Sequence, residues 1–148
     1  MDTSETYIKM SDCPEIQKEA RYIGDNMEEL GNWFAFYVTG KWQPPVIYTY
    51  GLCLPYERGD YAVWLPRQDQ LQEMVKEGNK FSYTNNLVLA GKFDKFCSWQ
   101  ANDITSLDWS MEQLWLAFVM KEKYNKVCVN NEWRNGKVSR WGLEPQTP

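Results

Sequence analysis

The sequence contains no histidine among its 148 residues. Histidine is the commonest metal ligand and the commonest general base near neutral pH, so its absence removes the usual centre of metal binding and proton transfer. The four cysteines stand at positions 13, 53, 97 and 128, and no Cys-x-x-Cys pair suggests a zinc or redox site. We therefore expect no metal and no other cofactor.

Long apolar runs and phosphate-binding loops are also missing. No run approaches the roughly 18 residues that a membrane-spanning helix needs, and the acidic start lacks the basic and apolar regions of a signal peptide. The "AGK" at 90–92 lacks the glycine spacing and the following Ser or Thr of a P-loop. We expect no membrane partner and no export. The cysteines should then be reduced and buried, although their even number would also suit two disulfides.

Aromatic residues are abundant, with eight Trp, nine Tyr and six Phe making up 16% of the chain. A chain of this length fits one domain with one hydrophobic core. We predict a single domain over 1–148, in which 141–148 form a flexible tail.

Charge is unevenly spread along the chain, whose net charge is −4. Residues 1–30 hold eight acidic and three basic side chains, whereas 121–140 hold six basic and two acidic ones. These segments can be solvated faces, or the second can be a basic patch for an acidic partner. The overall balance makes binding of duplex DNA unfavourable.

The pattern of the first half predicts an antiparallel, aromatic-rich sheet. Runs of aromatic and β-branched residues between Gly, Pro and Asn predict strands at 33–38, 46–50 and 61–65. The dipeptide Asn135-Gly136 predicts a terminal hairpin that places Trp133 opposite Val138, and Asn130-Asn131 could make a second turn. We expect this hairpin to extend the sheet.

Helices are predicted in three places, which makes the expected fold class α+β. One begins near Pro14, with Ser11 and Asp12 as cap candidates, and an amphipathic one spans 66–77. The third, at 110–124, has a capping-box pattern, and its apolar residues extend beyond one face, so it should lie centrally or offer a second face to a partner chain. Most of 81–108 fits neither period and is predicted to be loop.

Aromatic side chains in the predicted loops are the candidate binding residues. Trp and Tyr are enriched at binding hot spots and can stack on bases. Packing in the core is the alternative for every aromatic residue of the chain. The candidates, with the bases beside them, are Trp42, Tyr56, Trp99, Lys41, Arg58 and Lys95.

Paired carboxylates leave an enzymatic alternative open. A hydrolase could use Glu57 with Asp60, or Asp103 with Asp108, but nothing in the sequence determines the separation within either pair. Solvent-exposed acids are the commoner explanation for such residues. We therefore predict a protein that is not an enzyme.

Three stretches of the chain resemble a family of small, uncharacterised phage and prophage proteins. They are "TYIKMSDCPEIQ" at 6–17, "VWLPRQDQLQEM" at 63–74 and "SMEQLWLAFVMKEKYNKV" at 110–127. The resemblance implies expression in the cytoplasm of an infected bacterium, and it brings no catalytic residues with it. By analogy it favours an inhibitor of a bacterial host protein or defence system, of the anti-CRISPR kind. The alternatives are a protein that sequesters a nucleotide or single-stranded nucleic acid, and the carboxylate hydrolase.

Overall fold

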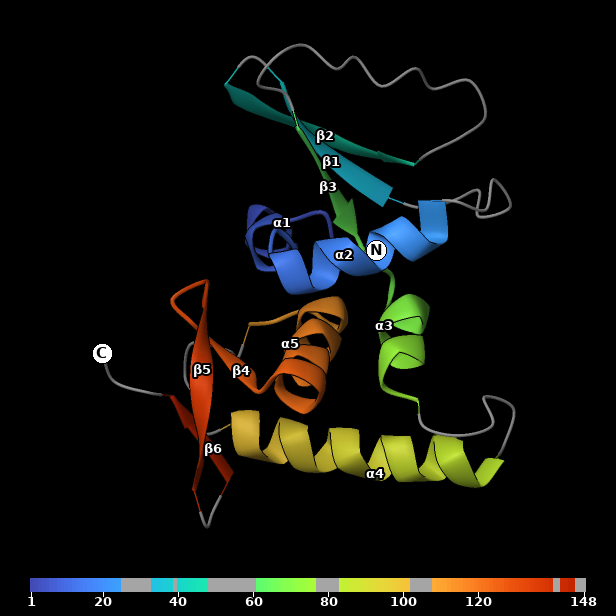
Figure 1. Ribbon diagram of the computed structural model, residues 1–148, viewed down its shortest axis with the longest axis vertical. Coiled ribbons are helices and arrows are strands. Elements are labelled where there is room, and N and C mark those ends of the chain that lie inside the picture. Colours follow the sequence, from blue (N-terminus) through green and yellow to red (C-terminus); the bar gives the residue numbers. More distant parts are fainter. Residues whose placement is uncertain are drawn as a thin grey trace. The chain divides into compact units, whose positions relative to one another are not determined.

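In the computed structural model the chain forms two compact units, Met1–Arg67 and Gln68–Pro148 (Figure 1). Each unit contains helices and an antiparallel three-stranded sheet, so the predicted α+β class is confirmed. The expectation that the terminal strands extend the first sheet was wrong, because these strands form a sheet of their own. The single domain over 1–148 stays a prediction. The structure describes residues 1–24, 33–38, 40–47, 61–76, 83–101, 108–139 and 142–145.

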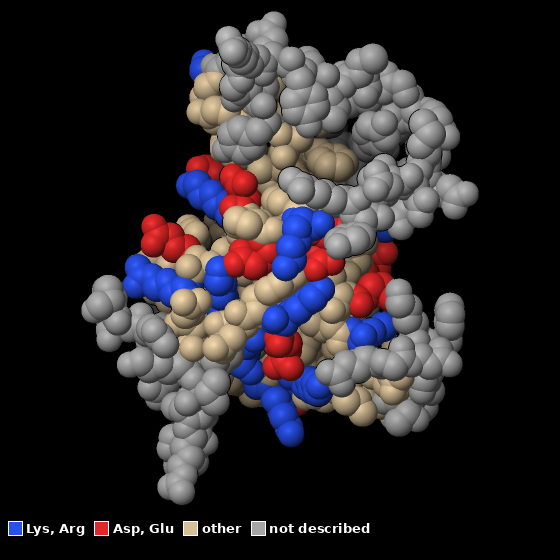
Figure 2. Space-filling model, in the orientation of Figure 1, with Lys and Arg blue, Asp and Glu red and all other residues tan. Residues whose placement is uncertain are grey.

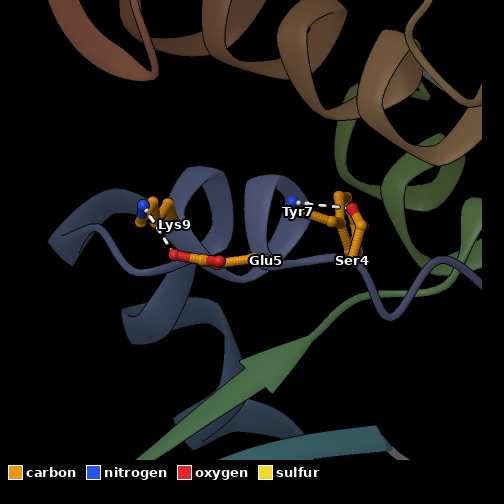
Figure 3. A network of polar contacts seen from close by, with 4 residues as sticks. All are labelled: Ser4, Glu5, Tyr7 and Lys9. Carbon is orange, nitrogen blue, oxygen red and sulfur yellow. Dashed lines mark hydrogen bonds and ion pairs between the residues drawn. The ribbon is translucent and has the colours of Figure 1, made fainter. Parts of the chain in front are cut away.

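The first unit begins with helix α1 (Glu5–Ser11), which the sequence analysis did not predict. The Ser4 hydroxyl accepts a hydrogen bond from the Tyr7 amide at 3.1 Å and caps the helix. Lys9 pairs with Glu5 one turn earlier at 2.8 Å, as Figure 3 shows. This ion pair lowers the pKa of the Glu5 carboxyl.

Helix α2 (Pro14–Gly24) begins at the predicted proline, but its cap differs from the prediction. Ser11 is the last residue of α1, and Asp12 is the C-cap of that helix. The carbonyl of Cys13 accepts from the amides of Ile16 and Gln17 and so starts α2. Helix α1 ends just before Pro14, so Ser11 and Asp12 belong to the end of α1 and do not cap α2.

The first sheet has the strand order β2-β1-β3. Strands β1 (Trp33–Val38) and β3 (Tyr61–Leu65) match their predicted bounds, whereas β2 (Lys41–Ile47) begins five residues before its predicted start. Gly40, with φ of 81°, makes the tight turn between β1 and β2, so pairing resumes at once. Pro44 and Pro45 are compatible with β2 because it is an edge strand.

The core of the first unit lies between α1, α2 and β3. Tyr7, Met10, Ile16 and Trp64 are almost fully buried there. The Tyr7 hydroxyl donates a 2.6 Å hydrogen bond to the carbonyl of Pro66, just after β3. This bond and the apolar contacts attach α1 to the end of the sheet.

The amide of Gln17 on α2 pairs with the backbone of β3 as a neighbouring strand would. Its Oε1 accepts from the Trp64 amide at 2.9 Å, and its Nε2 donates to the Trp64 carbonyl at 3.0 Å. Nε2 also donates to the Ser11 carbonyl at 2.9 Å. One side chain thus satisfies two backbone groups on the edge of the sheet and connects them to the end of α1.

In the second unit, helix α5 (Met111–Tyr124) is central, as predicted. Ser110 and Gln113 form the predicted reciprocal capping box, and Asn125 ends the helix in a left-handed conformation. Within its unit α5 packs against α3 (Gln68–Val75), α4 (Tyr83–Gln100) and strand β4 (Lys126–Val129) (Figure 1). These three neighbours explain why apolar residues surround this helix.

Helix α4 corrects the prediction that most of 81–108 is loop. Residues 83–100 form one helix of 18 residues, although Asn85, Asn86 and Gly91 are poor helix formers. Tertiary packing stabilises the helix despite this low propensity, because the Phe93 ring stacks on Trp115 of α5 with centroids 3.9 Å apart and planes 6° apart. No helix of the described residues is long and apolar enough to cross a membrane.

The terminal sheet also differs from its prediction, because the turn lies at Asn130-Asn131 and not at Asn135-Gly136. Both asparagines have positive φ, and β4 pairs with β5 (Glu132–Ser139) so that Cys128 faces Trp133. Strand β6 (Gly142–Pro145) pairs with β5 in turn. Half of the predicted flexible tail is therefore strand, and 146–148 lie outside the described residues.

Candidate functional site

Two of the predicted binding residues, Lys41 and Trp42, lie in strand β2 and not in a loop. Trp42 packs edge-on against Tyr37 of β1, with ring centroids 5.2 Å apart, and remains half-buried, while Lys41 is exposed. The structure thus uses Trp42 in a cross-strand aromatic pair. Tyr56 and Arg58 lie outside the described residues.

The other described pair, Lys95 and Trp99, lies on helix α4. Trp99 is half-buried beside Phe96, with ring centroids 5.8 Å apart, and the Lys121 Nζ lies 5.6 Å from the centre of its ring. This cation–π contact is with the chain's own lysine, so it competes with a stacked ligand. Lys95 is exposed on the same helix.

A groove between α3, α4 and α5 is the clearest concave site in the described part of the second unit. Its main cavity measures about 150 Å³, and a smaller one of about 60 Å³ shares Val75, Leu89 and Lys92 with it. Met74, Val75, Leu89 and Phe118 are the apolar residues among those that line the main cavity. Because these residues come from three helices, the groove exists only when all three are packed together.

Lysines outnumber acids among the described residues that line this groove. Lys76, Lys92 and Lys123 line the main cavity together with one described acid, Glu122. Lys76 also pairs at 2.6 Å with Glu73, which reduces its effective charge. The described lining therefore carries a small net positive charge in a chain whose overall charge is −4. On the face that Figure 2 shows, basic and acidic side chains are interspersed.

Val88 is an exposed apolar side chain of α4 at the lysine-rimmed groove. It is 53% exposed and lines the smaller cavity. Leu87 is 55% exposed on the same helix but lines neither cavity. A large apolar side chain that is exposed at a cavity can be covered by a partner.

Sequence reasoning missed this groove because its longest wall is the helix that was predicted to be loop. The one sequence signal that pointed toward it was the basic segment 121–140, which includes Lys123. The spacing of Leu87 and Val88 gave no clue, since apolar residues occur all around α4 and define no single face.

Of the acids considered for the alternative hydrolase, Asp108 is exposed before α5, while Glu57, Asp60 and Asp103 lie outside the described part of the chain. Among described residues, no three Cys, Asp or Glu side chains lie close enough together to hold a metal ion.

Three cysteines are described, and all three are thiols outside any disulfide. Cys13 and Cys128 are buried and Cys97 is half-buried. Burial raises the pKa of the Cys97 thiol, and the negative charge of Asp94 one turn earlier raises it further. A thiol with a raised pKa holds less thiolate at neutral pH and is a weak nucleophile.

Replacing Asp94 with asparagine is expected to increase the rate at which iodoacetamide alkylates Cys97 at pH 8. Loss of the negative charge lowers the pKa of the thiol while burial still keeps it raised, so more thiolate is present at that pH. Peptide mass spectrometry after timed alkylation measures the rate at this one cysteine. Asp94→Glu retains the charge and serves as the control, and equal rates in all three proteins would contradict the electrostatic explanation.

Comparisons of the chain with protein-family models, with curated proteins and with solved structures found no match.

Proposed function

We propose that this chain is a small phage-encoded binding protein, without enzymatic activity, that inhibits a bacterial host protein belonging to a defence system. The proposed contact surface is the lysine-rimmed groove together with Val88. The observation that carries the proposal is that Val88, a large apolar side chain, is more than half exposed and lines a cavity of the groove. Exposure of such side chains is unfavourable in water and is reversed when a partner covers them.

The size of the groove favours a protein partner over a nucleotide. Sites for small molecules usually enclose about 300–1,000 Å³, whereas the main cavity here measures about 150 Å³. A cavity of this size suits the side chains of a partner protein. The described aromatic candidates Trp42 and Trp99 already contact Tyr37, Phe96 and Lys121 within the chain.

The proposal is tested by capture from the bacterial host, followed by reconstitution with purified components. We expect the tagged chain to retain one host protein, to form a complex of defined stoichiometry with it and to inhibit its activity. Val88→Gln should weaken this complex about fivefold, because burial of the exposed half of this side chain contributes about 1 kcal/mol. Isothermal titration calorimetry with the purified partner measures the change.

Met111→Gln is the matched control, because Met111 is 51% exposed on α5 and lines neither cavity of the groove. It removes an exposed apolar side chain from the same unit and should leave the affinity unchanged. Equal loss in both variants, or no loss in Val88→Gln, would count against the groove as the contact surface. A captured protein that the purified chain neither binds nor inhibits would count against the function itself.

Nucleotide binding is the competing function, and Trp fluorescence distinguishes it. We expect a flat titration with nucleoside mono-, di- and triphosphates and with single-stranded oligonucleotides. Saturable quenching would instead favour a protein that sequesters a nucleotide or single-stranded nucleic acid.

A further inference from the structure

We infer that the lysine-rimmed groove receives an acidic amphipathic helix of the partner protein. This inference rests on the proposed function and adds the chemistry of the segment that is recognised. Charge is the first argument, since Lys76, Lys92 and Lys123 line the cavity and Glu122 is the one acid among its described lining residues. Carboxylates on the partner would meet these lysines, whereas a basic segment would be repelled.

The walls of the groove indicate that the bound segment is helical. Lining residues come from α4, α5 and the C-terminal end of α3 with the following Lys76, and no described strand lines either cavity. An extended segment would lose water from its amides and carbonyls in this groove without gaining a strand edge to pair with. A helix satisfies its own backbone and presents only side chains.

The dimensions of the groove set the spacing of the partner's apolar residues. Along α4 the lining runs from Asn85 to Lys92, which is about 10 Å or two helical turns at 1.5 Å per residue. The main cavity of about 150 Å³ holds one large side chain, and Val88 offers a second apolar contact at the smaller cavity. Two apolar side chains three or four positions apart on the partner fit both places.

A display library of random peptides of about 12 residues, or three helical turns, tests the inference with the full chain as bait. We expect the enriched peptides to combine two large apolar residues three or four positions apart with an excess of Asp and Glu. Lys92→Glu/Lys123→Glu should weaken the best synthetic peptide at least about tenfold in fluorescence anisotropy. Enrichment of neutral or basic peptides, or no enrichment, would overturn the inference.

Lys18→Glu/Lys126→Glu is the control, because it changes the charge equally at residues that line neither cavity. It should bind the peptide as the unaltered chain does, and equal loss in both double variants would contradict a local site. Salt provides a test without any substitution, since the affinity should fall as ionic strength rises and a salt-independent affinity would contradict the role of the lysines. Circular dichroism of the free and bound peptide should show helix on binding, and an extended bound peptide would also refute the inference.

The outcomes separate this inference from the proposed function. If a host protein binds and is inhibited through the groove but presents no acidic helix, the inference is refuted and the proposed function is supported. If acidic helical peptides bind the groove but no host protein is inhibited, the proposed function is refuted and the inferred chemistry of the groove is supported.

Discussion

Replacing Phe118 with alanine is expected to lower the free energy of unfolding of the second unit by about 3–5 kcal/mol. Phe118 is fully buried on α5, and its ring lies 5.5–5.6 Å, centroid to centroid, from Phe93, Phe96 and Trp115. Alanine would remove the ring that all three contact and leave a cavity between α4 and α5. Urea denaturation followed by circular dichroism measures the loss, with the two units allowed to unfold separately.

Two further substitutions on α5 make this result specific. Phe118→Leu keeps much of the buried volume and should cost clearly less than the alanine variant. Met111→Ala shortens an exposed side chain on the same helix and should change the stability by no more than about 0.5 kcal/mol. If Phe118→Ala were as mild as Met111→Ala, the aromatic contact between α4 and α5 would not hold the unit together.

The same aromatic contact explains why α5 could be predicted from the sequence and α4 could not. The start of α5 depends on a local signal, since Ser110 and Gln113 lie three residues apart and bond each other's backbone. Nothing local marks α4, whose Gly91 and paired asparagines favour other conformations. Its helical state depends on Phe93 and Phe96 meeting a helix more than ten residues away in the sequence, and a periodicity argument does not include such contacts.

The terminal hairpin shows how packing decides between two turn signals. Asn130-Asn131 and Asn135-Gly136 can both adopt positive φ. Strand β4 begins directly after α5 ends at Asn125, and its Val127 and Cys128 are buried. The strand is only four residues long, and the chain turns directly after it. Gly136 is then buried in β5, and its amide donates to the Asn125 carbonyl at 2.9 Å. The stronger local signal was wrong because the end of α5 decided the register.

The candidate site could not be predicted from the sequence for a related reason. Aromatic residues were taken as binding candidates where loops were predicted, but Trp42 and Trp99 lie in a strand and a helix and contact neighbours there. The lysine-rimmed groove requires residues from 74 to 123 to come together across three helices. Charge composition could flag the basic segment 121–140, yet only the packing of α3, α4 and α5 brings Lys123 beside Lys76.

Replacing Gln17 with leucine is expected to lower the free energy of unfolding of the first unit by about 2–4 kcal/mol, because two backbone groups of Trp64 lose their partner. Each unsatisfied group that stays away from water costs about 1–3 kcal/mol. Leucine has similar volume and preserves the helix, so lost hydrogen bonds and not lost packing should dominate. Urea denaturation gives the total, and hydrogen exchange at the Trp64 amide should become faster because its acceptor is gone.

Gln43→Leu is the matched control for this change. It makes the same replacement at an exposed position of β2 in the same unit and should alter the stability by no more than about 0.5 kcal/mol. Gln17→Glu adds a second comparison, since a carboxylate can still accept from the Trp64 amide but cannot donate to the Trp64 and Ser11 carbonyls. Exchange at the Trp64 amide should therefore stay slow in Gln17→Glu while the stability falls. Fast exchange in both variants would mean that the Gln17 side chain protects this edge by its bulk and not by its hydrogen bonds.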